Sequence, residues 1–591
     1  MDLPVLAAQP ESPASAGATE TAVARPAVPP QNDPLWWRSA VIYQIYIRSF
    51  ADGNGDGIGD LAGVRKHLGY LRDLGVDAIW FTPWYESPLA DGGYDVADYR
   101  TINPAFGKLA EAEALIQEAL QFGIRTIIDV VPNHISDQHP WFQAALSAGP
   151  GSPERERFWF RRGGGPDGDE MPTRWVSNFL GETWTRTTNP DGTPGEWYLH
   201  LFTPQQPDLN WNHPDVRAEH DAILRFWFDR GVAGVRIDSA ALLVKDETLP
   251  EVPQDPRPGE HPNQDRDELH EIYRGWRAIA DSYAGTRVLV GEIWLPDIER
   301  FAMYLRPDEL HTAFNFDFLA RPWNAEELRT SIDETLAAHA PVNAPSTWVL
   351  SNHDVTRPVT RYGREDSSFA FVKKRVGTPT DLVLGQRRAR AAALLTAALP
   401  GSLYIYQGDE LGLPEVEDLP ADRLEDPMHF RSGGIDPGRD GCRVPLPWRG
   451  IHPPFGFSPA GALDDPWLPQ PESWAHLTVE AEQSDPASML WLYRQALRIR
   501  RKTEGLGDGP LAWCEGPADV LTFARGEHFV NVTNLSDSPI VLPEHTAILL
   551  CSSPLEHGLL PPDSTAWLRT QHQPPESLAV HRRDAQTHHQ Q

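Results

Sequence analysis

The chain has 591 residues, a mass of 66.0 kDa and a formal net charge of −31 at pH 7. This charge repels nucleic acid and anionic membrane surfaces, so we expect neither as a partner. Its three cysteines, an odd number, predict no disulfide framework and favour a reducing, cytoplasmic location. The sequence has no run of the about 18 apolar residues that a bilayer-spanning helix needs. Its first residues lack the pattern of a signal peptide.

Short apolar runs rich in β-branched residues alternate with helical patterns along the chain. The first strand is predicted at residues 41–46, and the next helix places its apolar positions on one face: Leu61, Val64, Leu68, Leu71 and Leu74. Further strands are predicted at residues 77–81, 125–131, 232–237, 288–293, 313–316, 347–350 and 402–406. Eight strands that alternate with helices predict a parallel α/β barrel, the TIM (β/α)8 fold.

Two segments break this alternation. Between residues 132 and 213 the periodicity fails over a stretch too long for an ordinary loop, which predicts a small domain inserted after the third strand. Asp485-Pro486 is typical of a helix start and predicts the last barrel helix at residues 487–502. After Gly505, runs at residues 520–523, 529–532 and 547–551 predict a C-terminal antiparallel β domain.

The predicted organisation has five parts. A disordered tail covers residues 1–33, and the barrel covers residues 34–131 and 214–504. The inserted domain covers residues 132–213, the β domain residues 505–570, and a second polar tail residues 571–591.

Three carboxylates, Asp238, Glu292 and Asp354, each stand at the end of an apolar run. A carboxylate just past a buried parallel strand lies at the carboxyl end of the barrel, which is the end where barrel enzymes carry their active sites. Acids crowded into one pocket repel one another and resist desolvation. Their convergence therefore indicates acid/base and nucleophilic chemistry.

These segments resemble the α-amylase superfamily of retaining α-glycoside hydrolases, glycosidase family thirteen. Asp129-Val-Val-Pro-Asn-His134 is similar to the family's first block, and the segments around the three carboxylates resemble its later blocks. Gln206-Pro-Asp-Leu-Asn210 is similar to the variant of the oligo-1,6-glucosidases and α-glucosidases. The resemblance covers roughly residues 36–500, with five motifs in the family's order. It implies the barrel fold and cleavage of α-glucosidic bonds.

The resemblance also implies roles for the acids. Asp238 would be the nucleophile, Glu292 the general acid and base, and Asp354 the residue that holds the sugar hydroxyls in an oxocarbenium-like geometry. Arg236 lies two residues before Asp238, on the same face of the predicted strand, so its charge should favour the ionised form of Asp238.

Five further residues are implied as substrate contacts. His134 and His353 would hydrogen-bond the hydroxyls of the sugar on the non-reducing side of the cleaved bond. Asp95 would grip the terminal glucose, and Tyr94 would stack on its ring. Arg443 resembles the α-glucosidase arginine that pairs with this aspartate. Such a pair would close one end of the pocket, so the enzyme would attack chain ends.

The segment after the first strand alternates oxygen-bearing residues with glycines, an arrangement typical of a calcium loop, although it lacks the final glutamate of an EF-hand. A structural Ca²⁺ or Mg²⁺ ion, as the related loop binds in oligo-1,6-glucosidases, is predicted on Asp52, Asn54, Asp56, Ile58 and Asp60. The alternative is a Gly/Asp turn without an ion. No organic cofactor is expected.

The predicted function is exo-acting hydrolysis of the terminal non-reducing α-glucosidic bond of small oligosaccharides. Ser239 resembles the Ala or Thr of α-1,4-specific relatives more than the Val of α-1,6-specific ones, so α-1,4 bonds are favoured and α-1,6 bonds are possible. The long segment 242–274 would project over the active face and crowd out a polymer.

Three alternatives stay open at this point. A transglycosylase or mutase acting on trehalose or sucrose would share the acids and differ only in how an acceptor competes with water. A polymer-cleaving amylase would need an open cleft. A non-catalytic partner subunit of a transporter would need a membrane helix and broken acids, and neither pattern is present.

Overall fold

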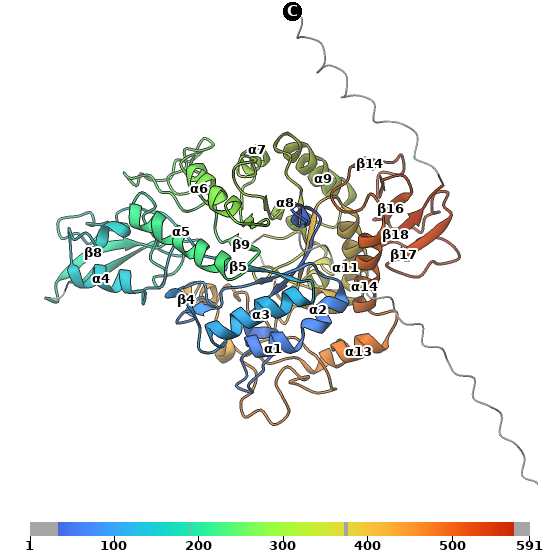
Figure 1. Ribbon diagram of the computed structural model, residues 1–591, viewed down its shortest axis with the longest axis horizontal. Helices are drawn as coiled ribbons and strands as arrows, with labels where there is room; N and C mark the ends of the chain where they lie inside the picture. The colour runs from blue at the N-terminus through green and yellow to red at the C-terminus, as the bar shows by residue number, and fades with distance from the viewer. Residues whose placement is uncertain (1–32, 190, 371–375, 572–591) are drawn as a thin grey trace, which may run out of the picture.

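The computed structural model describes residues 33–189, 191–370 and 376–571. Both predicted tails lie outside these residues except for Asp33 and Gln571. Figure 1 shows a central barrel, a lobe around α4 and β8 at one end, and an antiparallel sheet at the other. No helix among the described residues is long and apolar enough to cross a membrane.

The described residues contain an eight-stranded parallel sheet with the order β11-β10-β9-β5-β2-β1-β13-β12. Its strands are β1 (Val41–Ile45), β2 (Ala78–Phe81), β5 (Arg125–Val130), β9 (Gly234–Ile237), β10 (Val288–Gly291), β11 (Thr312–Ala313), β12 (Thr347–Val349) and β13 (Ser402–Tyr406). Between the two end strands, the Asn315 N–H donates to the Thr347 carbonyl at 3.1 Å, and the hydroxyls of Thr312 and Thr347 are hydrogen-bonded. The predicted barrel is therefore confirmed.

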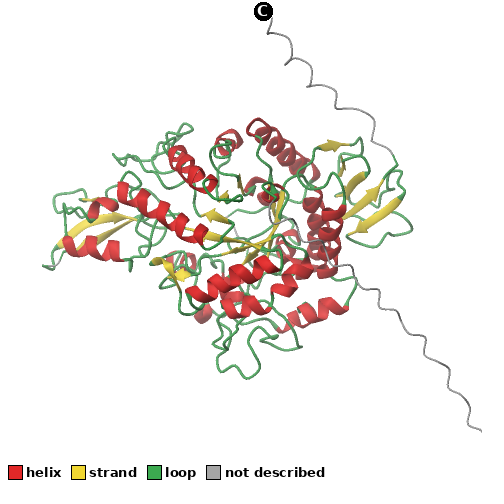
Figure 2. Ribbon diagram, in the orientation of Figure 1, coloured by secondary structure: helices red, strands yellow, loops and turns green. Residues whose placement is uncertain are grey.

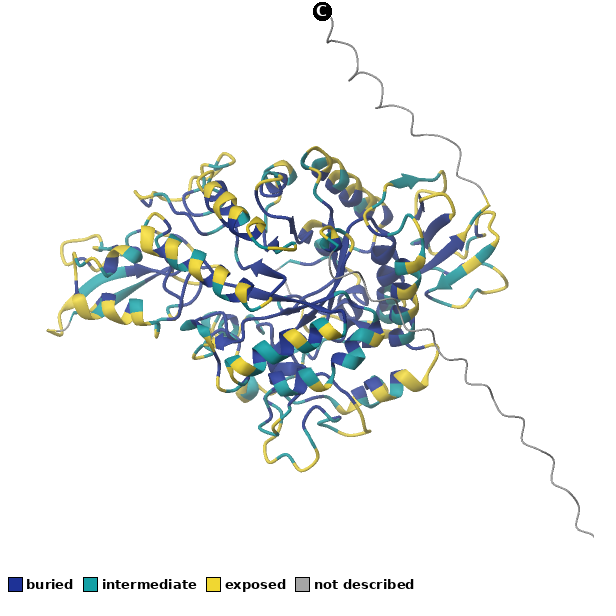
Figure 3. Cartoon of the chain, viewed as in Figure 1, coloured by how far each residue is buried: buried dark blue, intermediate teal, exposed yellow. Residues whose placement is uncertain are grey.

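Helices surround these strands (Figure 2). They are α1 (Leu61–Lys66), α2 (Leu68–Leu74), α3 (Leu109–Gln121), α5 (Pro214–Asp229), α6 (Leu269–Asp281), α7 (Ile298–Met303), α8 (Phe316–Ala320), α9 (Ala325–His339), α10 (Pro358–Tyr362), α11 (Leu382–Ala398), α13 (Val479–Ser484) and α14 (Met489–Lys502). The barrel strands and the inner helix faces are buried (Figure 3). The apolar runs in the sequence thus correspond to strands covered on both faces.

Two helix predictions need correction. The helix expected over Leu61–Leu74 is interrupted at His67, whose ring stacks on Trp448 with centroids 3.7 Å apart. The last barrel helix begins at Met489, and its N-cap is Ser488, whose hydroxyl accepts from the Trp491 N–H. Asp485 accepts instead from the Ala487 N–H at 2.9 Å, which closes a turn before the helix.

The sixth strand is also shorter than predicted. Asn315 caps α8 by accepting from the Phe318 N–H, so the chain turns into a helix where residues 313–316 suggested an extended strand.

The segment between β5 and α5 forms a lobe of its own. It contains α4 (Pro140–Ala148) and a three-stranded antiparallel sheet of β6 (Phe160–Arg161), β7 (Trp184–Thr188) and β8 (Pro194–Leu199), in the order β6-β8-β7. Its core is aromatic and includes Trp159, Trp175, Phe179 and Trp184. A smaller hairpin, β3 (Tyr85–Glu86) with β4 (Asp98–Ile102), follows β2.

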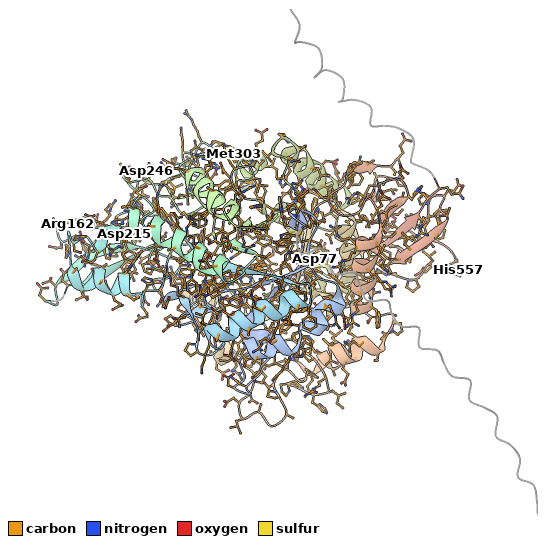
Figure 4. The ribbon with its side chains drawn as sticks, viewed as in Figure 1. Asp77, Arg162, Asp215, Asp246, Met303 and His557 are labelled. Carbon is orange, nitrogen blue, oxygen red and sulfur yellow. The ribbon has the colours of Figure 1, made fainter. Side chains whose placement is uncertain are left out.

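The C-terminal sheet has the order β14-β15-β16-β18-β17. The predicted runs are β15 (Val520–Arg525), β16 (Phe529–Asn534) and β17 (Ala547–Cys551), and the structure adds β14 (Leu511–Trp513) and β18 (Ser564–Arg569). This sheet packs on α11, where the Trp567 indole donates to the Leu394 carbonyl at 3.2 Å. The loop after β9, marked by Asp246 in Figure 4, lies on the side of the molecule away from His557 of this sheet.

Candidate active site

A cavity of about 610 Å³ lies at the carboxyl ends of the barrel strands. Asp238, Glu292 and Asp354 all line it, as do residues 174–176, 178 and 179 of the inserted lobe and several residues of the loop after β9. The Asp238 N–H donates to the Val130 carbonyl and the Glu292 N–H to the Ile237 carbonyl, both at 2.9 Å. Hydrogen bonds of the barrel ladder therefore fix the backbone of both acids.

The Arg236 guanidinium lies at the centre of the cluster, with a side chain only 1% exposed. Its Nη1 is 2.8 Å from Asp129 Oδ1 and 2.7 Å from Asp238 Oδ1, and its Nη2 is 2.6 Å from Glu292 Oε2. Asp129 lies in β5, and Asp238 and Glu292 directly follow β9 and β10; these three strands are neighbours in the sheet. One cation therefore joins three buried carboxyl groups, which could not approach one another without it.

Two acids of this cluster, Asp238 and Asp129, have a raised pKa. Burial raises the pKa of Asp238, the Arg236 charge opposes the rise, and Glu292 and Asp129 add to it. Burial likewise raises the pKa of Asp129 to about 7 against the effect of Arg236. Carboxyl groups that interact this closely release their protons as a set. Asp238 and Asp129 therefore hold a proton more readily than isolated carboxyl groups do.

Asp354 has the opposite environment. Burial by itself would raise its pKa, but the positive charges of Arg439 and Arg443 hold the pKa well below its usual range. Arg439 Nη1 is 3.0 Å and Arg443 Nη2 is 2.9 Å from Asp354 Oδ1. Asp354 is thus an anion across the working range of an enzyme, whereas the pKa of Asp238 is shifted in the opposite direction.

A chain of hydrogen bonds links His353 to the cluster. Gln44 Nε2 lies 2.7 Å from His353 Nδ1, and the Tyr94 hydroxyl lies 2.7 Å from His353 Nε2. The Tyr94 hydroxyl also donates to Asp129 Oδ2 at 3.0 Å, and its ring stacks on His353. Burial lowers the pKa of His353, so the ring is neutral. Both ring nitrogens have protein partners, and the predicted sugar contact would replace the bond to Tyr94.

His134 lines the cavity beside Gln206. Its Nε2 lies 3.0 Å from Gln206 Nε2 and 3.2 Å from the Tyr94 carbonyl oxygen. Burial lowers the pKa of His134 to about 4, which leaves a neutral imidazole. Gln206, from the segment Gln206–Asn210 that resembles the family's α-glucosidases, also donates to Asp91 Oδ2 at 3.0 Å.

The predicted pair of Asp95 and Arg443 is not formed. Asp95 is fully buried outside the cavity lining, where it accepts from the Ser87 hydroxyl and from two backbone N–H groups of its own loop. Arg443 lies behind the cavity, where it holds Asp354 and the His353 carbonyl. The ion pair in the cavity wall is instead formed by Asp91 and Arg439, with Asp91 Oδ1 2.6 Å from Arg439 Nη2.

Sequence reasoning therefore missed Asp91 and Arg439. Each lies four residues before the residue that was predicted, in the same loop and with the same charge. The sequence offers two candidates in each loop, and only the turn geometry decides which one faces the cavity.

The glycine-rich loop after β1 closes on itself. Asp52 accepts from the N–H groups of Asn54, Gly55 and Gly57, and Asp60 caps α1 by accepting from Gly63 N. Burial raises the pKa of Asp60, and the nearby charges of Asp52 and Asp56 add to the shift. This repulsion is what a bound cation would relieve.

The fit of this loop to a metal ion is partial. In the described part of the chain, no three His, Cys, Asp or Glu side chains form a cluster that could hold an ion. A cation here would therefore also need Asn54 and the backbone carbonyl of Ile58. The ion stays a prediction.

Comparisons with known proteins agree with this geometry. The family model of the α-amylase catalytic domain matches residues 44–509. The chain is 35% identical over 527 residues to a probable α-glucosidase of Rhizobium meliloti (strain 1021), covering 85% of this chain and 90% of that protein. It is 32% identical over 560 residues to the oligo-1,6-glucosidase of Parageobacillus thermoglucosidasius, covering 86% of this chain and 92% of that one.

The solved structure of the trehalulose synthase MutB from Pseudomonas mesoacidophila MX-45 superposes with a TM-score of 0.78 at 30% identity, over 90% of this chain and 99% of that chain. A barrel with strand-end carboxyl groups around one cavity, together with these relatives, defines a glycoside hydrolase. The chain belongs to the α-amylase family, as its motifs implied.

The corrected cavity wall gives a first prediction. Asp91→Asn should lower kcat/KM for maltose by about 10- to 100-fold, because Arg439 loses a charged partner inside the cavity. Asp95→Asn should instead lower the melting temperature, because its amide meets the Ala90 N–H donor, and should retain more activity than Asp91→Asn below that temperature. Steady-state kinetics and thermal melts of both variants make the comparison. Equal activity losses would contradict the assignment of Asp91.

The glycine-rich loop gives a second prediction. Excess chelator should lower the melting temperature by about 2 °C or more, because an ion bound only by the folded chain stabilises it by mass action. The Asp56→Asn variant, which loses one loop charge, should show a smaller chelator effect. Elemental analysis of the purified protein accompanies the melts. An identical melting curve with and without chelator, and no metal in the protein, would leave the loop as a plain turn.

Proposed function

We propose that the protein is a retaining, exo-acting α-glucosidase that hydrolyses the terminal non-reducing bond of small oligosaccharides. The observation that carries this proposal is the Arg236 cluster in a cavity whose wall holds the ion pair of Asp91 and Arg439. The α-glucosidase and oligo-1,6-glucosidase relatives support the substrate class.

The chemistry needs one ionised and one protonated carboxyl group at the cleaved bond, and Asp238 and Glu292 are the two carboxyl groups that Arg236 brings together in the cavity. Asp238 attacks the anomeric carbon while Glu292 gives its proton to the departing oxygen. Glu292 then takes a proton from water, which releases glucose and frees Asp238. Glu292 is oriented by the Trp294 indole, which donates to Oε1 at 3.1 Å, and by the Ser239 N–H, which donates to Oε2 at 3.0 Å.

Cleavage at chain ends follows from the cavity walls. Asp91 is held by Arg439 and Gln206, so charged and amide groups fill the side of the cavity that a continuing chain would have to cross. The inserted lobe also contacts the loop after β9 beside the cavity, where the Trp175 indole donates to the Pro250 carbonyl at 2.9 Å. A polymer therefore has no open groove through the site.

Two further features belong to the proposal. A cytoplasmic location agrees with three free cysteines in the described chain, of which Cys442 is buried and uncrosslinked. A preference for α-1,4 bonds rests on Ser239, which lines the cavity beside the nucleophile.

A second candidate function is glucosyl transfer. The likeness to a trehalulose synthase favours it, because that enzyme and a hydrolase of this fold can share one set of acids. The two functions differ in whether water or a sugar intercepts the glycosyl-enzyme, so chromatography of the products from sucrose, trehalose and maltose separates them. Net release of free glucose supports hydrolysis, and isomerised disaccharides support transfer.

The roles of the acids give a third prediction. Asp238→Asn and Glu292→Gln should each lower kcat by at least a thousandfold, about 4 kcal/mol of activation free energy, while thermal melts remain cooperative. Asp238→Asn with more than a tenth of the wild-type activity would show that another group is the nucleophile.

The stereochemistry checks the same mechanism independently of any variant. NMR of the first product formed should show the α-anomer of glucose, because two displacements restore the original configuration. The β-anomer as first product would rule out the covalent route.

Ser239 gives a fourth prediction. Its φ is +47°, a backbone region that a β-branched side chain rarely adopts, so Ser239→Val should cost about 1–3 kcal/mol of stability as well as narrow the cavity. The ratio of isomaltose to maltose hydrolysis should rise about tenfold. Ser239→Ala, which lacks the branch, is the matched control and should leave the ratio near that of the wild type.

The relative rates of the wild-type enzyme on maltose, isomaltose and soluble starch test both the closed cavity and the role of Ser239. Maltose should be hydrolysed faster than soluble starch and at least as fast as isomaltose. A faster rate on starch would contradict the closed cavity. A clear preference for isomaltose would contradict the interpretation that Ser239 favours α-1,4 bonds.

A further inference from the structure

A second cavity lies at the amino ends of the barrel strands, at the opposite end of the barrel from the active site. Its volume is about 360 Å³, within the range of about 300–1,000 Å³ that is typical of small-molecule sites. Val41 begins β1, Asp77 precedes β2 and Arg125 begins β5, and these three strands are neighbours in the sheet. Asp77 marks this region in Figure 4. None of the described residues that line this cavity also lines the active site.

Arginine side chains from two elements line this cavity. The Arg125 guanidinium carbon lies 4.6 Å from the centre of the Trp36 ring, and Trp36 also lines the cavity. Arg501, near the end of α14, donates from Nη2 to Asp77 Oδ1 at 2.7 Å and to the Gly75 carbonyl at 2.9 Å. The Arg501 side chain is 25% exposed, so its guanidinium is held in place and still open to a ligand.

Two further arginines, Arg500 and Arg525, bind main-chain carbonyl groups at this end. Arg500 lines the cavity and donates to the Ala397 carbonyl at 2.6 Å. Arg525 lies behind the wall and donates to the carbonyls of Gly507 at 2.8 Å and Gly509 at 3.0 Å. Carbonyl groups solvate a cation without cancelling its net charge, and burial lowers the pKa of Arg500 to about 10 and that of Arg525 to about 9. A negative charge in the cavity would offset this cost.

The carboxylates at this end do not balance the arginines. Asp33 and Asp77 line the cavity. Asp508 lies nearby, but its charge is offset by Arg38, whose Nε is 2.5 Å from Asp508 Oδ2. Two carboxylates therefore stand against four guanidinium groups among the described residues that line or back the cavity, which are Asp33, Asp77, Arg125, Arg500, Arg501 and Arg525. This local excess of two positive charges occurs in a chain whose net charge is −31.

The charge and the geometry of the arginines select a class of ligand. A guanidinium group presents a planar fork of donors that matches the oxygens of a phosphate group. A phosphate monoester carries a charge of about −1.5 to −2 at pH 7, which would balance the excess, whereas a carboxylate carries only one charge. Ser39 and Thr503 line the cavity and can donate hydroxyl hydrogen bonds to further oxygens. Charges of the distant surface are screened beyond about 8 Å at physiological ionic strength, so the local excess decides.

We propose that this cavity binds a small phosphate-bearing anion, either inorganic phosphate or the phosphate group of a monoester with a small polyol body. The anion contacts the amino ends of the barrel strands and the end of α14. It also neutralises Arg525, which lies in β15, so it fastens the C-terminal β domain to the barrel. The site stabilises the fold and does not compete with a sugar for the active site.

Titration calorimetry of the full chain tests the binding. Inorganic phosphate, glycerol 3-phosphate and sodium chloride are compared at equal ionic strength. We expect saturable binding of one phosphate per chain with a Kd below about 1 mM, and a melting temperature raised by about 1 °C or more at saturation. Chloride should do neither. Tighter binding of glycerol 3-phosphate identifies the ester as the ligand, and tighter binding of inorganic phosphate identifies the free ion. Failure of both to bind would overturn the proposal.

Variants at the cavity locate the bound anion. Arg501→Gln should weaken phosphate binding by about tenfold or more, because a hydrogen bond between charged groups is lost. Arg498→Gln, at an exposed position of the same helix outside the cavity, removes the same charge and is the matched control. Its affinity for phosphate should stay near that of the wild type. An equal loss in both variants would show a general effect of charge and overturn the assignment of the site.

Ser39→Asp gives a second test that keeps every arginine. Ser39 is exposed at the cavity, so the substitution adds a negative charge there without disturbing the core, and it should weaken phosphate binding by about tenfold. This variant decides the question if Arg501→Gln melts early. Wild-type affinity in folded Ser39→Asp would overturn the proposal.

A variant of the active site separates the two cavities. Asp238→Asn removes a negative charge from the active site, so it would tighten the binding of a phosphate located there. We expect the same phosphate affinity as in the wild type, and a clear change would overturn the proposal. Because this measurement follows binding and not turnover, its result does not depend on whether the protein is an α-glucosidase.

Discussion

One guanidinium holds the active centre together. Arg236 contacts Asp129, Asp238 and Glu292, three carboxyl groups on neighbouring strands that would otherwise repel one another in a buried space. Removing one member of such a buried set typically costs about 3–5 kcal/mol, because the remaining charges lose their compensation. The barrel makes the arrangement possible: strands β5, β9 and β10 pair in register, and their side chains at the same level face the same interior.

The loops convert this centre into an enclosed cavity. The loops after β2 and β13 supply Asp91 and Arg439, which meet at 2.6 Å across a separation of 348 residues in sequence. A second buried ion pair, Lys245 with Asp208 at 2.8 Å, joins the loop after β9 to the inserted lobe. Lys245 also donates to Asn133 beside the cavity. These charged contacts set the shape of the cavity and therefore the kind of sugar chain that can enter.

The predictions from the sequence and the structure differ most in the loops. The two loop residues predicted to pair, Asp95 and Arg443, are turned away from each other, and their neighbours in sequence form the pair. Helix ends show the same limit: Ser488 and Asp485 are both good N-cap residues, and the packing of the chain decides between them. Residue type sets what a position can do, and the local turn sets which way it points.

The sequence by itself determined the barrel and its three cavity acids, because buried strands require continuous apolar runs and their ends have a defined direction. It also placed Arg236 correctly, since residues two apart on a strand face the same side. The tertiary structure alone decided which aspartate and arginine meet in the cavity wall, and that the pKa values of Asp238 and Asp354 shift in opposite directions. Contacts between loops far apart in sequence have no periodicity to reveal them, and the cost of burying a charge depends on every neighbour at once.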